Sequence, residues 1–304
     1  MNITRKPDFF IVGAPKCGTT SLYYYLRQHP QIFMPEYKEP HFFGKDLNKR
    51  SDEFIYDEAK YLTLFKNAES DQQIGESSTF YLYSKSAPGE IKEFNPNAKI
   101  IIMLRNPIDF LHSLHSQLLF SGNENVADFR EALKLEEDRL QGKNLPENID
   151  MVDKIYYKKH VSRIPEQIQN YIEIFGVENV TILILEDLQT DPESCYKKIL
   201  KMLNVNTEFS PNYTKQNTNK VVRNYWFRNI VKQYHNQLGN LRAIFYRKPF
   251  GIIKLFIRIN TRQLQRKPIP IDLKNKLIYE LKSNIEQIEM IINKDLSHWK
   301  LLDS

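Results

Sequence analysis

The residues GAPKCGTT, numbers 13–20, indicate the fold most directly, because the apolar run DFFIV at residues 8–12 precedes them and a segment with helical spacing follows. Their frame, G-x-x-x-x-G-x-T, matches the nucleotide-binding P-loop, in which a strand, a glycine-rich turn and a helix follow one another. Glycines let backbone N–H groups approach phosphate oxygens, and the helix N-terminus adds partial positive charge. The segment therefore predicts an anion-binding turn between a buried strand and a helix over residues 19–29.

The lysine of this turn stands at an unusual place. P-loop kinases and ATPases carry lysine directly after the second glycine, but here Thr19 stands there and Lys16 lies two positions before Gly18. Thr20 and Ser21 add further hydroxyl groups to the first helical turn. An ammonium inside the turn suits the phosphate nearest a reacting bond rather than a β/γ-phosphate with magnesium. The alternative is an ordinary strand–turn–helix with a lysine at the surface.

Apolar runs alternate with amphipathic segments along the rest of the chain. Further strands are expected at residues 73–76, 99–104 and 179–185, and helices at residues 52–65, 88–94, 107–120, 156–175, 192–203 and 271–293. Such alternation is typical of a parallel sheet with helices on both faces. The sequence thus predicts an α/β, P-loop-type three-layer fold with a central parallel sheet flanked by helices. We expect a single domain over residues 1–304, with a helical lid or acceptor-side insertion around residues 204–270.

Composition narrows the class of protein. The 304 residues include 43 Lys and Arg against 37 Asp and Glu, a net charge of +6, and 41% are hydrophobic, which excludes a disordered chain. The basic residues are scattered rather than gathered in one stripe, so no nucleic-acid partner is expected. Two cysteines are too few for a disulfide scaffold and favour a reducing compartment. Because no run of about 18 uncharged apolar residues occurs, a soluble, cytoplasmic protein is expected.

Two of these segments together resemble a known family. PKCGTTSL at residues 15–22 is similar to the 5′-phosphosulfate loop of sulfotransferases that use 3′-phosphoadenosine 5′-phosphosulfate. LRNP at residues 104–107 with Ser113 resembles the family's 3′-phosphate motif, although Phe110 stands where related motifs often carry Arg. An arginine fork and a hydroxyl suit a phosphate. The resemblance implies this donor as co-substrate, adenosine 3′,5′-bisphosphate as product, and no metal.

The resemblance also implies which residues bind the donor. They come from the glycine-rich turn, from the arginine motif, and from a polar loop that closes over the nucleotide in related enzymes. These residues are Lys16, Cys17, Gly18, Thr19, Thr20, Ser21, Arg105, Ser113, Asn217 and Lys220. For the polar loop, the alternative is a solvated basic segment.

Other segments agree with the family over almost the whole chain. EPHFF at residues 39–43 resembles the acceptor-side segment of glycan-modifying and bacterial members. GESSTFY at residues 75–81 resembles the segment after the second strand, with Ser77 where some glycan-modifying members have Lys. EDL at residues 186–188 and DLSHW at residues 295–299 also match.

The implied reaction moves a sulfuryl group from a phosphate–sulfate anhydride to an acceptor hydroxyl or amine. The leaving phosphate gains negative charge, and Lys16 is expected to stabilise it. Glu39 precedes Pro40, which favours an extended backbone, so the side chains of Glu39 and His41 are expected to face one pocket. The resemblance gives the role of base to Glu39, with His41 beside it. The alternative is that Glu39 pairs with a neighbouring lysine at the surface and His41 packs on the adjacent phenylalanines.

Three weaker candidates remain. Cys17 at a helix N-terminus is a candidate reactive thiol, although packing is the favoured interpretation. His112 and His115 lie three positions apart on one expected helix, a spacing that suits a metal, but no third ligand is evident and no metal site is expected. Residues 242–266 mix basic and apolar side chains, a pattern that suits peripheral contact with an anionic membrane, an acceptor-pocket lid, or core packing.

Three functions therefore compete. The first is metal-independent sulfuryl transfer to a carbohydrate, lipid or small-molecule acceptor. The second is a P-loop small-molecule kinase, which would require magnesium. The third is a non-catalytic module that binds anions or membranes. The position of Lys16 favours the first, while the acceptor and the oligomeric state stay open.

Overall fold

The fold is built around one parallel sheet. A computed structural model describes residues 5–51, 54–147, 149–214, 220–222, 261–263 and 266–302. Within them, five parallel strands pair in the order β2-β3-β1-β4-β5. These strands are β1 (Phe9–Gly13), β2 (Ile32–Phe33), β3 (Gln73–Ser77), β4 (Lys99–Leu104) and β5 (Val180–Ile184). The arrangement confirms the predicted α/β fold with a central parallel sheet.

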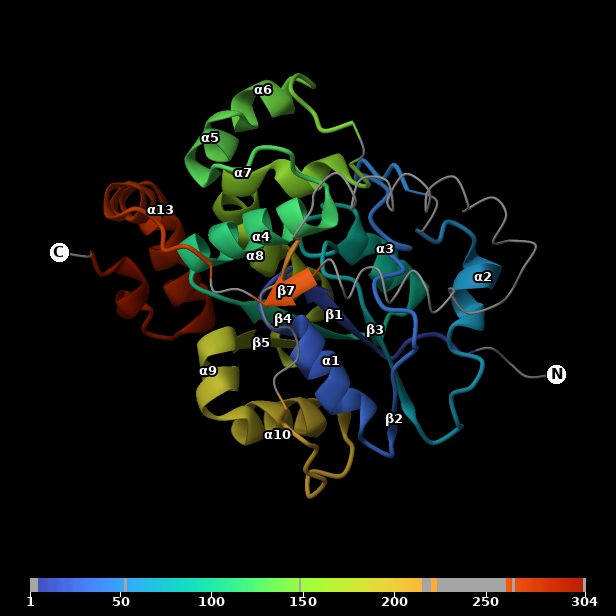
Figure 1. Ribbon diagram of the computed structural model, residues 1–304. Coiled ribbons are helices and arrows are strands. Elements are labelled where there is room, and N and C mark those ends of the chain that lie inside the picture. Colours follow the sequence, from blue (N-terminus) through green and yellow to red (C-terminus); the bar gives the residue numbers. More distant parts are fainter. Residues whose placement is uncertain are drawn as a thin grey trace.

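Helices cover both faces of the sheet, as Figure 1 shows. In that view α1 (Thr19–Arg27) and α10 (Pro192–Leu203) lie below the sheet, and α8 (Ile164–Phe175) lies above it. The other helices of the described residues are α2 (Glu58–Thr63), α3 (Ala87–Phe94), α4 (Pro107–Ser121), α5 (Phe129–Lys134), α6 (Glu136–Leu140), α7 (Tyr157–Ser162), α9 (Leu185–Thr190) and α13 (Ile271–Ile292). Among these described helices, none combines the length and the apolar character needed to cross a bilayer.

The central strands are apolar on both faces because helices bury both. All five residues of β1 are buried, and so are all residues of β4 after Lys99. Such continuous apolar runs are the expected signature of parallel strands that have helices on either side. In an open parallel sheet, ligands bind beyond the carboxyl ends of the strands. The strands β1 and β4 are neighbours, so their carboxyl ends lie side by side.

Some expected helix boundaries were wrong for physical reasons. The single helix expected over residues 156–175 is two helices, α7 and α8, because Pro165 lacks an N–H and fits a first turn but not a helix interior. The helix expected over residues 52–65 shortens to α2, whose N-cap Asp57 accepts a hydrogen bond from the first turn. The N-cap expected at Asp191 of α10 is confirmed.

Two glycines give the turn after β1 its shape. Gly13 has φ +149°, and a Cβ there would lie 2.5 Å from the Thr79 carbonyl oxygen. Gly18 has φ +88°, and a Cβ there would lie 2.6 Å from Leu185 Cδ1. Because any side chain at either position would strain the backbone and collide with its neighbour, the two glycines of the motif are required by the fold itself.

The region expected to form a lid lies mostly outside the described residues. Of residues 204–270, the structure describes an irregular segment up to residue 214, two short strands and the last residues. The strands, β6 (Lys220–Val222) and β7 (Thr261–Gln263), pair antiparallel, and β6 lies against α4. The lid or insertion, and the single-domain organisation, therefore stay predictions.

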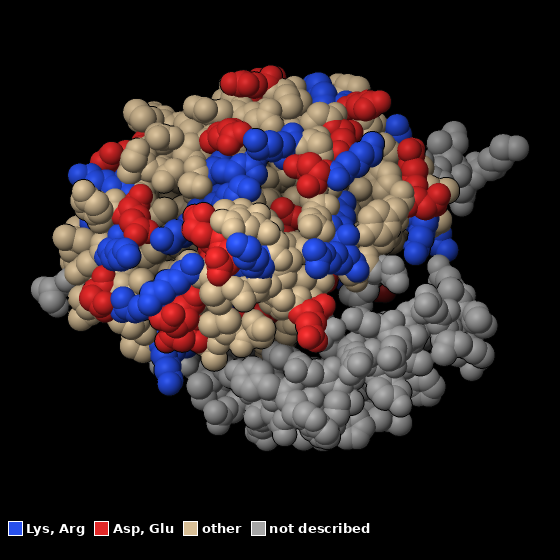
Figure 2. All heavy atoms as spheres, turned by 90° about the horizontal axis from the view of Figure 1, so that it is seen from above, with Lys and Arg blue, Asp and Glu red and all other residues tan. Residues whose placement is uncertain are grey.

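Surface charge agrees with the scattered pattern of the sequence. On the face that Figure 2 shows, Lys and Arg are interspersed with Asp and Glu, and no stripe of one sign crosses the coloured part of that face. A mixed surface gives little long-range attraction for a polyanion such as a nucleic acid.

Candidate active site

The two predicted phosphate motifs meet at the edge where β1 and β4 end. The Ala14 N–H donates to the Met103 carbonyl oxygen at 2.8 Å, which ties the turn to the last residues of β4. Arg105 Nη1 donates to the Lys16 carbonyl oxygen at 3.4 Å. The structure thus brings together two motifs that lie 89 positions apart in the sequence.

Within the part of the chain that the structure describes, the N-terminus of α1 is suited to bind an anion. Gly18 is the N-cap residue, among the described residues no side chain caps the helix, and the first turn contains no acidic residue. The first N–H groups of a helix have no intrahelical acceptor, so those of Thr19 and Thr20 are available to phosphate or sulfate oxygens. Cys17 is buried, and burial raises the pKa of its thiol to about 12, which leaves it protonated and favours packing over reactivity.

Lys16 points toward α4 rather than into bulk water. Its backbone is left-handed, with φ +63°, and its Nζ donates to Gln117 Oε1 at 3.1 Å. Burial and the charges of Arg266 and Arg105 together lower the pKa of Lys16 to about 8, while the charge of Glu39 opposes them. Lys16 is thus partly buried rather than fully solvated, and its role in the turn stays a prediction.

Arg266 is a site residue that the sequence did not single out. Its pKa is lowered by burial and by the charge of Arg105. Arg266 in turn lowers the pKa of Lys16, and it assists burial in lowering the pKa of His112 to about 4. Three cationic side chains, from the turn, from the end of β4 and from the segment before α13, therefore act on one another. Only the basic composition of residues 242–266 pointed toward this region.

An acidic residue close to Arg105 and a buried hydroxyl both lie on α4. Arg105 Nη2 lies 3.6 Å from Asp109 Oδ2. Ser113, two helical turns further along α4, is 2% exposed. A role for Ser113 in phosphate binding stays a prediction. Lys220 belongs to β6, beside α4, and Asn217 lies outside the described residues, so their roles also stay predictions.

The two histidines of α4 pack on Phe129. His115 Nε2 lies 2.9 Å from the Val126 carbonyl oxygen, and the rings of His112 and His115 both lie against Phe129. In the described part of the chain, no three His, Cys, Asp or Glu residues gather in a way that suits a metal ion.

Glu39 and His41 do meet, but not through an extended backbone. Glu39 has φ +61° and His41 has φ +47°, so the expectation that Pro40 would make the segment extended was wrong. Tertiary contacts impose the tight path: Glu39 N–H donates to the Ser77 carbonyl oxygen, and Lys49 Nζ donates to the carbonyl oxygen of His41 at 2.6 Å. The two side chains still face each other, with His41 Nε2 3.6 Å from Glu39 Oε2.

These two groups differ in burial and charge. The Glu39 side chain is 37% exposed and pairs with Lys38, whereas His41 is 1% exposed. Burial raises the pKa of Glu39, but Lys38 and His41 outweigh it and hold that pKa below its usual range. Burial also lowers the pKa of His41, against the pull of Glu39, so the imidazole is neutral near pH 7. The His41 ring packs on Phe54, not on the adjacent phenylalanines that the alternative named.

The acceptor-side carboxylate and the turn belong to one site. Glu39 raises the pKa of Lys16 through its charge, which requires the two groups to be close. A carboxylate and an ammonium in one half-buried site can accept a proton from a nucleophile and stabilise a leaving anion.

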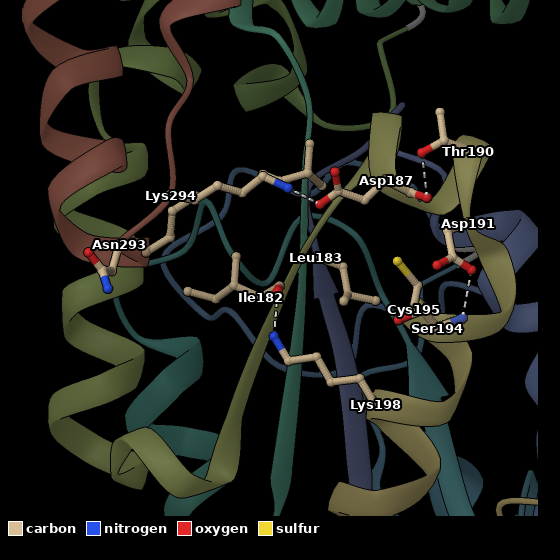
Figure 3. A pocket seen from close by; sticks show the side chains of 12 residues that line it. Ile182, Leu183, Asp187, Thr190, Asp191, Ser194, Cys195, Lys198, Asn293 and Lys294 are labelled. Atoms are coloured by element: carbon tan, nitrogen blue, oxygen red, sulfur yellow. Dashed lines mark hydrogen bonds and ion pairs between the residues drawn. The ribbon is translucent and has the colours of Figure 1, made fainter.

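A surface pocket of about 530 Å³ lies elsewhere, at the β5 edge of the sheet (Figure 3). Residues of β5, α9, α10 and the end of α13 line it, and Lys294 pairs with Asp187 across it. None of the predicted site residues lines this pocket.

Comparisons with known proteins agree with this geometry. A family model described as the sulfotransferase domain matches residues 6–294. Carbohydrate sulfotransferase 15 of Mus musculus is 31% identical over 248 residues, which cover 66% of this chain and 44% of that protein. Bifunctional heparan sulfate N-deacetylase/N-sulfotransferase 3 of Homo sapiens is 26% identical over 254 residues, which cover 80% of this chain and 27% of that protein. The chain thus spans less than half the length of these curated relatives.

A solved structure extends the similarity to the whole fold. The crystal structure of a sulfotransferase from Alicyclobacillus acidocaldarius matches with a TM-score of 0.73 and 28% identity, and the match covers 98% of this chain and 100% of that one. A match of this extent takes in the parallel sheet and the turn after β1. The chain therefore belongs to the sulfotransferase family.

Proposed function

We propose that this enzyme takes its sulfuryl group from 3′-phosphoadenosine 5′-phosphosulfate and transfers it to a hydroxyl or amine of an acceptor. The acceptor atom forms a bond to sulfur while the bond from sulfur to the bridging phosphate oxygen breaks. The bridging oxygen keeps the electron pair and leaves within adenosine 3′,5′-bisphosphate. The acceptor proton passes to a carboxylate of the enzyme.

The observation that carries this proposal is the group of Lys16, Arg105 and Arg266 at the open N-terminus of α1. The N–H groups of the turn suit the 5′-phosphosulfate. Lys16 is placed to neutralise the bridging oxygen as charge develops on it, an interaction stronger in the transition state than in the ground state. Arg105 and Arg266, with Ser113, suit the second phosphate of the donor.

On the acceptor side, Glu39 is the proposed base. Its lowered pKa keeps it ionised near neutral pH, and 37% of its side chain is exposed, so an acceptor can reach it. His41 is neutral and buried, and we assign it to the positioning of the Glu39 carboxylate rather than to proton transfer. No step of this scheme needs a metal.

A carbohydrate is the first acceptor class to test. Two relatives that match the chain are named for carbohydrate and heparan sulfate acceptors, although Ser77 replaces a lysine that some glycan-modifying members carry. Lipid and small-molecule acceptors are the other arms of the test. Contact of residues 242–266 with a membrane, and a cytoplasmic location, stay predictions.

The test combines binding with turnover. Calorimetry with the metal chelated should detect binding of adenosine 3′,5′-bisphosphate. Labelled donor offered with sugars, glycosaminoglycans, lipid alcohols and phenols should label one class. Lys16→Ala should lower kcat by about 10²–10³-fold and keep the fold, while the exposed control Lys66→Ala should change nothing. Magnesium-dependent ATP consumption without binding of the bisphosphate would instead support a kinase.

A further inference from the structure

A buried carboxyl group that the proposed reaction does not use lies behind the acceptor-side loop, residues 39–43. Glu76, at the end of β3, is 0% exposed. Its Oε2 accepts a hydrogen bond from the Tyr61 hydroxyl at 3.3 Å. Its Oε1 is buried, and within the described residues no donor meets it at hydrogen-bond geometry. A buried carboxyl with an unmet oxygen is costly, so its presence needs a reason.

The hydroxyl groups around Glu76 are also the hydroxyl groups that hold the loop. The His41 N–H donates to Ser78 Oγ at 3.0 Å, and the Phe43 N–H donates to the Tyr81 hydroxyl at 3.3 Å. The same two hydroxyl groups, of Tyr81 and Ser78, lie close enough to Glu76 to stabilise its ionised form. Because each hydroxyl oxygen accepts from the loop, its proton is free to point toward the carboxylate.

We propose that Glu76 is a positioning residue for the acceptor side of the site: its carboxylate orients the hydroxyl groups of Ser78 and Tyr81, which fix the backbone of residues 39–43 and so the aim of Glu39 and His41. The kinetic part of this inference rests on the proposed function. The structural part, a carboxylate that holds a loop through two hydroxyl groups, does not.

The ionisation of Glu76 gives this arrangement a pH dependence. Burial raises the pKa of Glu76, while the hydroxyl groups of Tyr81, Ser78 and Tyr61 and the charge of Lys38 lower it. Burial outweighs them, and the resulting pKa is about 7. The titratable groups that face Glu76 from the surrounding elements are Lys38, Lys49, Tyr61, Tyr81 and Tyr171. Protonation adds a donor to a carboxyl group that accepts from Tyr61 and faces the hydroxyl groups of Ser78 and Tyr81, so the loop should loosen as the pH falls below about 7.

This dependence is separable from the other ionisations of the site. The pKa values of both Glu39 and His41 are lowered, and those of Lys16 and of Lys49, which also holds the loop, are about 8. We therefore expect an acid limb of kcat near pH 7 to follow the ionisation of Glu76 rather than that of the base, Glu39.

The test uses the whole chain and two measurements. Hydrogen exchange should report residues 39–43 for the wild type, Glu76→Gln and the exposed control Glu93→Gln, with β4 as internal standard. Glu76→Gln should accelerate exchange at His41 and Phe43 by about tenfold or more, because the amide removes the negative charge and replaces one acceptor oxygen with an NH2 donor. The control should match the wild type.

Kinetics supply the second measurement. The kcat of Glu76→Gln should fall about tenfold and lose its acid limb near pH 7, with KM for the donor unchanged. Tyr81→Phe keeps the ring and removes one linking hydroxyl, and should loosen Phe43 in the same way if Glu76→Gln fails to fold. Unchanged exchange at residues 39–43 in the variants, or an acid limb that persists in Glu76→Gln, overturns the proposal. Absence of sulfuryl transfer in the wild type would refute the proposed function, whereas the exchange result would still decide the role of Glu76.

Discussion

The charge of Lys16 should control the alkaline side of the pH profile. Burial and the two neighbouring arginines lower the pKa of Lys16 to about 8 in the free enzyme. The protonated fraction is then about 90% at pH 7 and about 10% at pH 9. Because kcat/KM reports the ionisation of the free enzyme, kcat/KM for the donor should fall about tenfold between pH 7 and pH 9. Bound donor brings negative charge, so the same limb in kcat should move to higher pH.

Replacement of Lys16 by arginine keeps the positive charge but removes its titration between pH 7 and pH 9. Arginine stays protonated throughout this range, so Lys16→Arg should have a lower kcat/KM at pH 7 but no alkaline limb between pH 7 and pH 9. Gln117→Glu places a carboxylate where Lys16 Nζ now donates to an amide oxygen at 3.1 Å, and should move the limb upward. Initial rates with labelled donor over a pH series measure both variants against the exposed control Lys66→Arg. An alkaline limb that stays near pH 8 in Lys16→Arg would refute the reasoning.

The remaining predictions concern the second phosphate, the base and the turn. Arg266→Ala should weaken binding of adenosine 3′,5′-bisphosphate by about 10–100-fold in calorimetry, because it removes charge-assisted hydrogen bonds; unchanged affinity would remove Arg266 from the site. Glu39→Gln should lower kcat by about 10²–10⁴-fold with KM for the donor unchanged, while Glu36→Gln, on the same segment, should keep its rate; equal effects would contradict a role as base. Gly18→Ala should cost about 1–3 kcal/mol in urea unfolding, because its backbone is left-handed and a Cβ would meet its neighbour at 2.6 Å. Gly89→Ala in α3, where nothing lies within 4 Å, should cost nothing, and a similar loss in both would show that the turn is not strained.

Local sequence predicted the elements that depend on local rules. The strand before the turn, the strand at residues 99–104 and the N-cap at Asp191 are all confirmed, because apolar runs and capping side chains act over a few residues. The same rules misjudged the segment around Pro40. Contacts from Ser77 and Lys49, distant in sequence, hold that backbone in a left-handed path that the residue before a proline rarely adopts.

The sequence by itself determined which chemical groups are available to the proposed reaction. It carries a glycine turn with an inserted lysine, a strand that ends in arginine, and a glutamate two positions before a histidine, and all of these are readable because each motif is continuous. Only the tertiary structure decided the state of those groups. The lowered pKa of Lys16 comes first from burial and then from the charge of Arg266, and the burial of Glu76 behind the acceptor-side loop comes from elements that surround it. Charge interactions and desolvation act through space, and the distances that set them exist only once the chain has folded.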